Sequence, residues 1–312
     1  MLNILCFGHQ NGEIFQRLSG RFPEANWLSS DRPHAEELAQ SDAIIGFGPQ
    51  FSPSLFEHTR QLKWIQSMTT GVDAIFGCAN LPDGVTVTST RGIHGPQMSE
   101  LAFLLMLSLI RNFPRMQKNQ QSHTWAVWPQ PLLYGKTATI VGLGAIAEAL
   151  IPRLKAFGMT VQAVTGSPRD LPGLDRCYGR ERIVEAAATC DFLIVIVPYA
   201  PETHHLVDAN VLGAMKPSAF LVNVARGGVL DETALIETLK ARRIAGAGLD
   251  VFTVEPLPAD SPLWDLDNVI ITPKIGGMSD IYLDQALPIV EANVAEFLAG
   301  RIDRLTNVVT RA

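Results

Sequence analysis

The sequence lacks the cysteine and histidine patterns that mark disulfide-bonded and metal-binding proteins. Its four cysteines, Cys6, Cys78, Cys177 and Cys190, show neither a CxxC motif nor zinc-ligand spacing. That spacing argues against a zinc site or a disulfide framework. No HExxH motif and no cluster of acidic residues with histidine is present, so we expect no metal. The cysteines are interpreted as buried thiols in a reducing cytoplasm.

Long apolar runs and blocks of basic residues are also missing. The longest apolar run, Leu101–Ile110, is shorter than the roughly 20 residues needed to span a bilayer. The N-terminal stretch lacks the basic and small-residue segments of a signal peptide. A net charge of −6 without a lysine- or arginine-rich block argues against nucleic acid or an anionic membrane as a partner. We therefore expect a cytoplasmic protein that binds neither nucleic acid nor a membrane.

What the sequence does contain is a repeated alternation of short apolar runs with helical patterns. This alternation is typical of parallel sheets built from βαβ units, and 312 residues suffice for about two domains. The fold class is therefore α/β. In the first part of the chain, strands are expected at residues 3–7, 43–47, 64–67 and 85–89, with helices at 12–19 and 34–40.

A long helical pattern starts at Pro96 and runs to about Arg111, followed by a polar arm at residues 112–130. A second strand series follows. Its six strands are expected at residues 137–141, 160–164, 192–197, 219–224, 246–251 and 269–271, with a final helix from 278 to 299 and a strand-like tail at 306–310. Six strands with intervening helices predict a dinucleotide-binding sheet.

The stretch TIVGLGAIA carries a GxGxxA fingerprint in the required strand–turn–helix setting. Gly142 permits the tight turn, and Gly144 lets the backbone approach a pyrophosphate. Ala145 and Ile146 open the helix whose N-terminus attracts phosphate, and Ala147 keeps that helix close to the strand. These residues predict a nicotinamide dinucleotide as cofactor.

The end of the next strand bears on the choice between NAD and NADP. NAD-specific folds usually place a carboxylate there, but this sequence reads Thr165-Gly166-Ser167-Pro168-Arg169. Nothing in that stretch repels a 2′-phosphate, and Ser167 and Arg169 are candidates to bind it. The sequence thus favours NADP and leaves NAD open.

Three further segments end strands of the same sheet and should face one crevice. LVNVARGGVLDE contains Arg226, GAGLDVFTVEPLP contains Asp250 and Glu255, and ITPKIGG contains Lys274. With the fingerprint and the segment VPYAPETHHLV, these motifs resemble those of the D-isomer-specific 2-hydroxyacid dehydrogenases over essentially the whole chain. The resemblance implies two Rossmann-like domains, a flavodoxin-like substrate domain and an NAD(P)-binding domain.

The resemblance also implies roles for individual residues. Arg226 would bind the carboxylate and carbonyl of a 2-oxo acid, and Glu255 would pair with the proton-exchanging group. That group is a histidine in the family, whereas this sequence has Lys274. Backbone amides of the loop at Thr70, Gly71 and Val72 would hold the substrate carboxylate. The remaining cofactor contacts would come from Val197, Pro198, Val224, Ala225, Asp250 and Met98.

A lysine in place of histidine changes the expected chemistry. An ammonium can donate a proton during reduction, but a lysine with an ordinary pKa of about 10.4 is a poor base near neutral pH. We therefore predict reduction over oxidation, with oxidation favoured only in alkaline solution. His94 is the alternative proton donor. A dinucleotide-binding regulatory or scaffold protein that has lost turnover is the alternative function.

The resemblance further implies the domain boundaries. Residues 1–95 with 288–312 would form the substrate domain, and residues 96–287 the NAD(P)-binding domain. The helix after Pro96 and the arm at 112–130 would form a homodimer interface.

Overall fold

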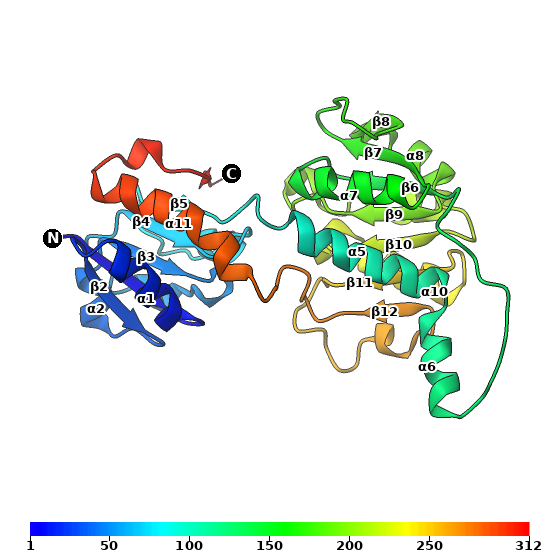
Figure 1. Ribbon diagram of the computed structural model, residues 1–312, viewed down its shortest axis with the longest axis horizontal. Helices are drawn as coiled ribbons and strands as arrows, with labels where there is room; N and C mark the ends of the chain where they lie inside the picture. The colour runs from blue at the N-terminus through cyan, green and yellow to red at the C-terminus, as the bar shows by residue number, and fades with distance from the viewer. Residues whose placement is uncertain (312) are drawn as a thin grey trace. The chain divides into compact units, whose positions relative to one another are not determined.

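The computed structural model describes residues 1–311, which divide into two compact units (Figure 1). The first unit comprises residues 1–93 with 280–311, and the second runs from His94 to Ser279. The first crossing lies close to the predicted boundary at 95. The second lies at 279/280 instead of 287/288, because Tyr282, Leu283 and Leu287 are buried in the core of the first unit.

The sheet of the first unit has the strand order β13-β5-β4-β3-β1-β2. The strands run parallel except β13, which pairs antiparallel with β5. Read from β2, the parallel strands follow the flavodoxin-like order 2-1-3-4-5, as predicted. The strand bounds are β1 Asn3–Phe7, β2 Asn26–Ser30, β3 Ala43–Gly46, β4 Trp64–Ser67, β5 Thr86–Thr88 and β13 Val308–Val309.

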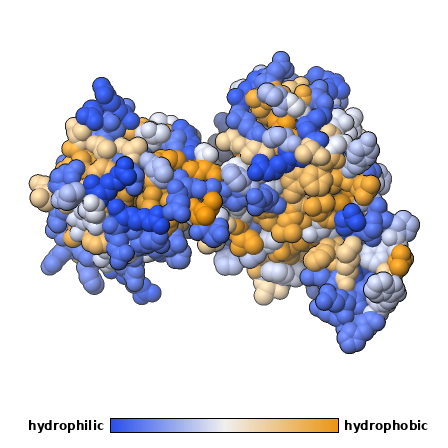
Figure 2. Space-filling view, in the orientation of Figure 1, coloured by the Kyte–Doolittle hydropathy of each residue, from blue (hydrophilic) through white to orange (hydrophobic). Residues whose placement is uncertain are grey.

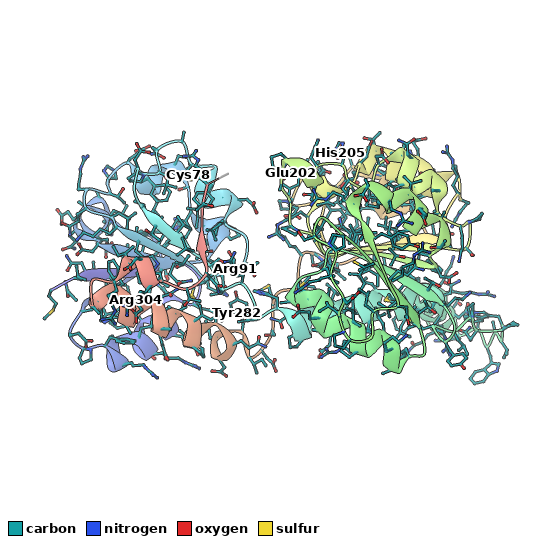
Figure 3. The ribbon with its side chains drawn as sticks, turned by 90° about the horizontal axis from the view of Figure 1, so that it is seen from above. Cys78, Arg91, Glu202, His205, Tyr282 and Arg304 are labelled. Carbon is teal, nitrogen blue, oxygen red and sulfur yellow. The ribbon has the colours of Figure 1, made fainter. Side chains whose placement is uncertain are left out.

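Helices cover both faces of this sheet, because its central strands are apolar on both sides. One face packs against α1 (Asn11–Arg21) and α11 (Tyr282–Leu298). The other face packs against α2 (Ala35–Gln40), α3 (Pro53–Phe56) and α4 (Asp73–Phe76). Tyr282, labelled in Figure 3, donates its hydroxyl hydrogen to the carbonyl oxygen of Met68 and so ties α11 to the end of β4.

The second unit contains an all-parallel sheet of seven strands in the order β12-β11-β10-β9-β6-β7-β8. Counted from β6, this is the 3-2-1-4-5-6 order of dinucleotide-binding folds with one strand added at the edge. The strand bounds are β6 Thr137–Val141, β7 Thr160–Thr165, β8 Arg176–Gly179, β9 Phe192–Val195, β10 Phe220–Asn223, β11 Gly246–Leu249 and β12 Val269–Ile271.

Two helix layers enclose this sheet (Figure 1). α5 (Gly95–Ile110) and α7 (Ala145–Ala156) pack on one face. α8 (Ile183–Thr189), α9 (Ala209–Ala214) and α10 (Glu232–Lys240) pack on the other. The long apolar helix predicted from Pro96 is α5, and it belongs to the core of the second unit. Among the described residues, no helix is long and apolar enough to cross a membrane.

The predicted arm begins with α6 (Phe113–Gln121), which buries none of its side chains. Beyond it Trp125 is 96% exposed, while the guanidinium of Arg115 lies 4.3 Å from the centre of the Trp128 ring. Apolar side chains also gather over α5 in Figure 2. Leu104 of α5 and Phe113 of α6 are exposed. Trp125 is therefore not a core residue of the single chain, and the homodimer stays a prediction.

Candidate active site

The turn between β6 and α7 has the backbone that the glycine fingerprint predicts. Gly142 adopts φ 109°, and a Cβ there would lie 2.9 Å from the backbone nitrogen of Val197. Gly144 is the N-cap residue of α7, and a Cβ there would have no other atom within 4 Å. Ala145 and Ile146 follow in the first turn, and Ala147 is fully buried. The first amides of α7 are therefore accessible to a phosphate group.

A cavity of about 290 Å³ opens beside this turn. Six predicted cofactor-binding residues line it: Gly142, Gly144, Thr165, Ser167, Val197 and Pro198. No carboxylate stands among its lining residues. The glycine turn, the exposed helix start and the adjoining cavity fit a dinucleotide.

Other predicted cofactor residues lie elsewhere in the second unit. Val224 and Ala225 are buried behind the end of β10. Arg169 pairs with Glu148 at 2.6 Å, donates to the carbonyl of Leu143, and does not line the cavity. Its contact with the cofactor stays a prediction. Sequence analysis missed Arg180, which lines the cavity from the segment after the polar edge strand β8.

Arg226 lies in the turn after β10, in a backbone that its neighbours fix. The buried side chain of Asn223 donates to the carbonyl of Arg226 at 3.2 Å and accepts from the amide of Ala225 at 3.0 Å. A Cβ on the following Gly227 would lie 1.9 Å from the carbonyl carbon of Phe252. Only glycine permits this approach, which joins the Arg226 turn to the loop that carries Glu255.

Lys274 and Glu255 form an ion pair between Nζ and Oε2. The second carboxylate oxygen of Glu255 accepts from the backbone amide of Phe252 at 3.2 Å, which orients the carboxylate. The lysine side chain is 51% exposed and that of the glutamate 27%. The ammonium is therefore held in place while it remains accessible to solvent and to a small ligand.

Asp250 fixes the loop that presents Lys274. Its two carboxylate oxygens accept from the amides of Ile275 and Gly276 and from the hydroxyl of Thr272, at 2.6–3.1 Å. Lys274 has φ 54°, a left-handed backbone that side-chain-bearing residues adopt only when their surroundings hold it. The predicted neighbour Met98 also lies here, since a Cβ on Gly276 would be 3.0 Å from its sulfur.

His94, the alternative proton donor, lies against the same loop. A Cβ on Gly277 would sit 3.4 Å from its ring carbon Cδ2. Burial, and then the positive charge of Arg226, lower the pKa of His94 to about 4. An imidazole with that pKa is neutral at physiological pH and has no ionic proton to donate.

This lowered pKa predicts a pH-dependent contribution to stability. The contribution is fully present above the unfolded value of about 6.5 and is lost as pH falls toward 4, because only the unfolded chain binds the proton in that range. In denaturant titrations, the unfolding free energy of the parent should decrease between pH 7.5 and pH 4.5. We expect this decrease to be about 2–3 kcal/mol smaller in His94→Gln. Parallel pH curves for the two proteins would contradict this expectation.

The predicted carboxylate-binding loop belongs to the first unit. Thr69 supports it: its hydroxyl donates to the carbonyl of Gly71 at 2.8 Å and accepts from the amide of Gly48 at 3.3 Å. Thr70 is exposed, Gly71 is half-buried and Val72 is buried at the start of α4. The loop is ordered by local hydrogen bonds, and its contact with substrate stays a prediction.

Comparison with known proteins places these features in context. The family described as D-isomer specific 2-hydroxyacid dehydrogenase, NAD binding domain, matches residues 103–276. The chain is 33% identical, over 86% of its length, to the D-3-phosphoglycerate dehydrogenase of Methanocaldococcus jannaschii, of which it spans 52%. It is 32% identical to glyoxylate/hydroxypyruvate reductase B of Pectobacterium carotovorum, covering 85% of each chain.

Solved structures of similar fold cover almost the full length of this chain. A D-isomer specific 2-hydroxyacid dehydrogenase family protein from Aeromonas salmonicida is 32% identical, with a TM-score of 0.91 and 99% of both chains covered. The NADPH-dependent glyoxylate/hydroxypyruvate reductase of Sinorhizobium meliloti, solved with NADP and sulfate, is 26% identical. Its TM-score is 0.84, with 98% of this chain and 97% of that chain covered.

A dinucleotide fold with a glycine turn, beside loops that present an arginine and an ion-paired lysine, is typical of nicotinamide-dependent oxidoreductases. Within that class, the chain belongs to the D-isomer-specific 2-hydroxyacid dehydrogenase family. Its enzyme class and its use of NAD or NADP are thereby established, and both agree with the sequence prediction.

Proposed function

We propose that this protein reduces a small 2-oxo acid to the D-2-hydroxy acid and prefers NADPH to NADH. The observation that carries the proposal is the ion pair of Lys274 with Glu255 in loops joined to the Arg226 turn. The names of the relatives in Pectobacterium and Sinorhizobium support glyoxylate and hydroxypyruvate as the substrate class.

Arg226 is assigned to the two oxygens that identify a 2-oxo acid. Its guanidinium offers parallel N–H donors that match a carboxylate and an adjacent carbonyl oxygen. One donor, Nη1, already bonds to the carbonyl of Ala225 at 2.7 Å, which directs the remaining donors. The amides of Thr70, Gly71 and Val72 are assigned to the substrate carboxylate.

Lys274 is assigned as the proton donor. A nicotinamide cofactor, when bound, would supply a hydride for the carbonyl carbon, so that negative charge would grow on the carbonyl oxygen of the substrate. Lys274 gives its proton to that oxygen and becomes a neutral amine, which regains a proton from solvent through its exposed side chain. Glu255 orients the ammonium through Oε2 and is itself held by the amide of Phe252.

The preference for NADPH rests on the end of β7. Thr165, Gly166 and Ser167 line the cavity where NAD-specific folds usually place an acidic residue. An acid there would bind the ribose hydroxyls and repel a 2′-phosphate, and none is present among the lining residues.

Steady-state assays with glyoxylate and hydroxypyruvate, each run with NADPH and NADH, test this proposal. We expect turnover of at least one acid, with kcat/KM at least about tenfold higher for NADPH. Equal or better activity with NADH would overturn the cofactor preference alone. Absence of turnover with either cofactor would instead favour a regulatory protein that binds dinucleotide without catalysis.

A further inference from the structure

One guanidinium at the dinucleotide cavity, that of Arg180, has no role in the function proposed above. Arg180 begins the short helix η2 (Arg180–Arg182), which follows the edge strand β8, and it lines the cavity together with Thr165, Gly166 and Ser167. Its hydrogen bond within the chain is a long one, 3.4 Å from Nη1 to the carbonyl of Glu202, labelled in Figure 3. Among residues 1–311 no carboxylate forms an ion pair with it.

The backbone at the end of β7 is shaped to receive this side chain. A Cβ on Gly166 would lie 2.9 Å from Nη2 of Arg180 and 3.4 Å from its Cζ. Because Gly166 has no side chain, the guanidinium rests against the strand end itself. The guanidinium thus lies against Gly166, the residue before Ser167. In dinucleotide-binding folds, the residues at this strand end contact the 2′ position of the adenosine ribose.

Neighbouring arginines are engaged elsewhere. Arg169, which the sequence offers first, pairs with Glu148 and bonds to the carbonyl of Leu143. Arg176 and Arg182 both pair with Glu185. Arg180 is therefore the arginine among the cavity-lining residues, and it carries a charge that no partner in the described chain neutralises.

We propose that Arg180 binds the 2′-phosphate of NADPH and determines the preference for NADPH over NADH, with the Ser167 hydroxyl as a second donor. This inference rests on the cofactor preference proposed above and assigns it to a residue. A planar guanidinium donates two parallel hydrogen bonds to a phosphate, whereas an NADH ribose offers it only neutral hydroxyls.

Calorimetric titration with nucleotide fragments tests the assignment without any need for turnover. The probes are adenosine 2′,5′-bisphosphate, which carries the 2′-phosphate, and adenosine 5′-monophosphate, which lacks it. In Arg180→Met we expect at least about tenfold weaker binding of the bisphosphate and less than about twofold change for the monophosphate. The matched control Arg182→Met removes another arginine of η2, one that pairs with Glu185, and should shift both affinities by less than about threefold. Arg169→Met tests the competing candidate for the 2′-phosphate.

Two further variants separate charge from geometry. Arg180→Lys keeps the positive charge but loses the two parallel N–H donors of the guanidinium. It should therefore retain part of the preference for the bisphosphate over the monophosphate. Gly166→Ala leaves Arg180 in the sequence but places a methyl group where the guanidinium rests, so it should weaken binding of the bisphosphate selectively. The displaced neighbour is the end of a flexible side chain, so the fold is preserved.

The outcomes are distinct. Selective loss of bisphosphate binding in Arg180→Met and Gly166→Ala supports the proposal. Equal weakening for both probes would place Arg180 on the adenine or ribose and overturn it, as would a selective loss in Arg169→Met alone. A parent protein that binds both probes equally would overturn both this assignment and the NADPH preference, while leaving the reductase activity to the assays above.

Discussion

Replacing Arg226 with Gln is expected to lower kcat/KM for 2-oxo acids by about 10³- to 10⁴-fold. A donor to developing oxyanion charge is worth about 10²–10³ in rate, and a charged hydrogen bond to the carboxylate adds about 1.5–3 kcal/mol of binding. Both are lost together, so KM should rise while kcat falls. Steady-state kinetics in the reductive direction measures the two effects separately.

The Arg226 experiment has a matched control in the same unit. Arg242 is an exposed arginine that pairs with Asp267. Arg242→Gln removes the same charge away from the site and should leave kcat/KM within about twofold of the parent. Arg226→Lys retains a positive charge without the parallel N–H donors of the guanidinium, so it should recover only part of the kcat/KM lost in Arg226→Gln. An Arg226→Gln enzyme within tenfold of the parent would remove this residue from substrate binding.

Lys274→Met is expected to reduce kcat for reduction by about 10²- to 10⁴-fold, the range that a positioned general acid contributes. Lys274→His should keep substantial reduction and should also oxidise the D-2-hydroxy acid near neutral pH, since imidazole can both give and accept a proton there. The parent should oxidise efficiently only in alkaline solution. The measurement is the pH dependence of kcat for both directions in all three proteins.

This comparison is balanced because Lys274 occupies a left-handed backbone position. Lysine, methionine and histidine all carry a Cβ and strain that backbone alike, so differences between them report on chemistry. His94→Ala supplies the competing test: His94 lies in the same loop environment but is neutral, and its removal should leave the pH profile for reduction unchanged. Parent oxidation governed by a base with pKa near 6.5 would contradict the assignment of Lys274.

The central strands of both sheets were predictable from sequence because they are apolar on both faces. The prediction missed β2 and β8, which lie at sheet edges and carry polar residues, with sequences NWLSS and RCYG. The boundary at 279/280 was also missed, because the first turns of α11 look equally apolar whichever core they join. Patterns of hydrophobicity identify buried elements, and edge strands give only a weak signal.

In the candidate site, the positions of backbone turns were predictable from the sequence, and the directions of long side chains were not. Gly142 and Ser167 lie at the cavity as predicted, because strand ends of a parallel sheet meet at one edge. The direction of a long side chain depends on which partners the folded chain brings near it. Arg169 and Arg180 both come from polar segments of similar composition, and only the packed chain shows that Glu148 engages the former while Gly166 receives the latter. A predicted edge strand at β8 would have brought Arg180 into consideration.

The contact between Gly227 and the carbonyl of Phe252 has a consequence for protein engineering. The turn with Arg226 and the loop with Glu255 meet backbone to backbone, so neither can be transplanted alone into a homologous scaffold. A graft that carries one and leaves the other would have to reproduce that approach to within a fraction of an ångström. The two segments should therefore be exchanged as a single cassette, and random mutagenesis of Gly227 should yield few active clones.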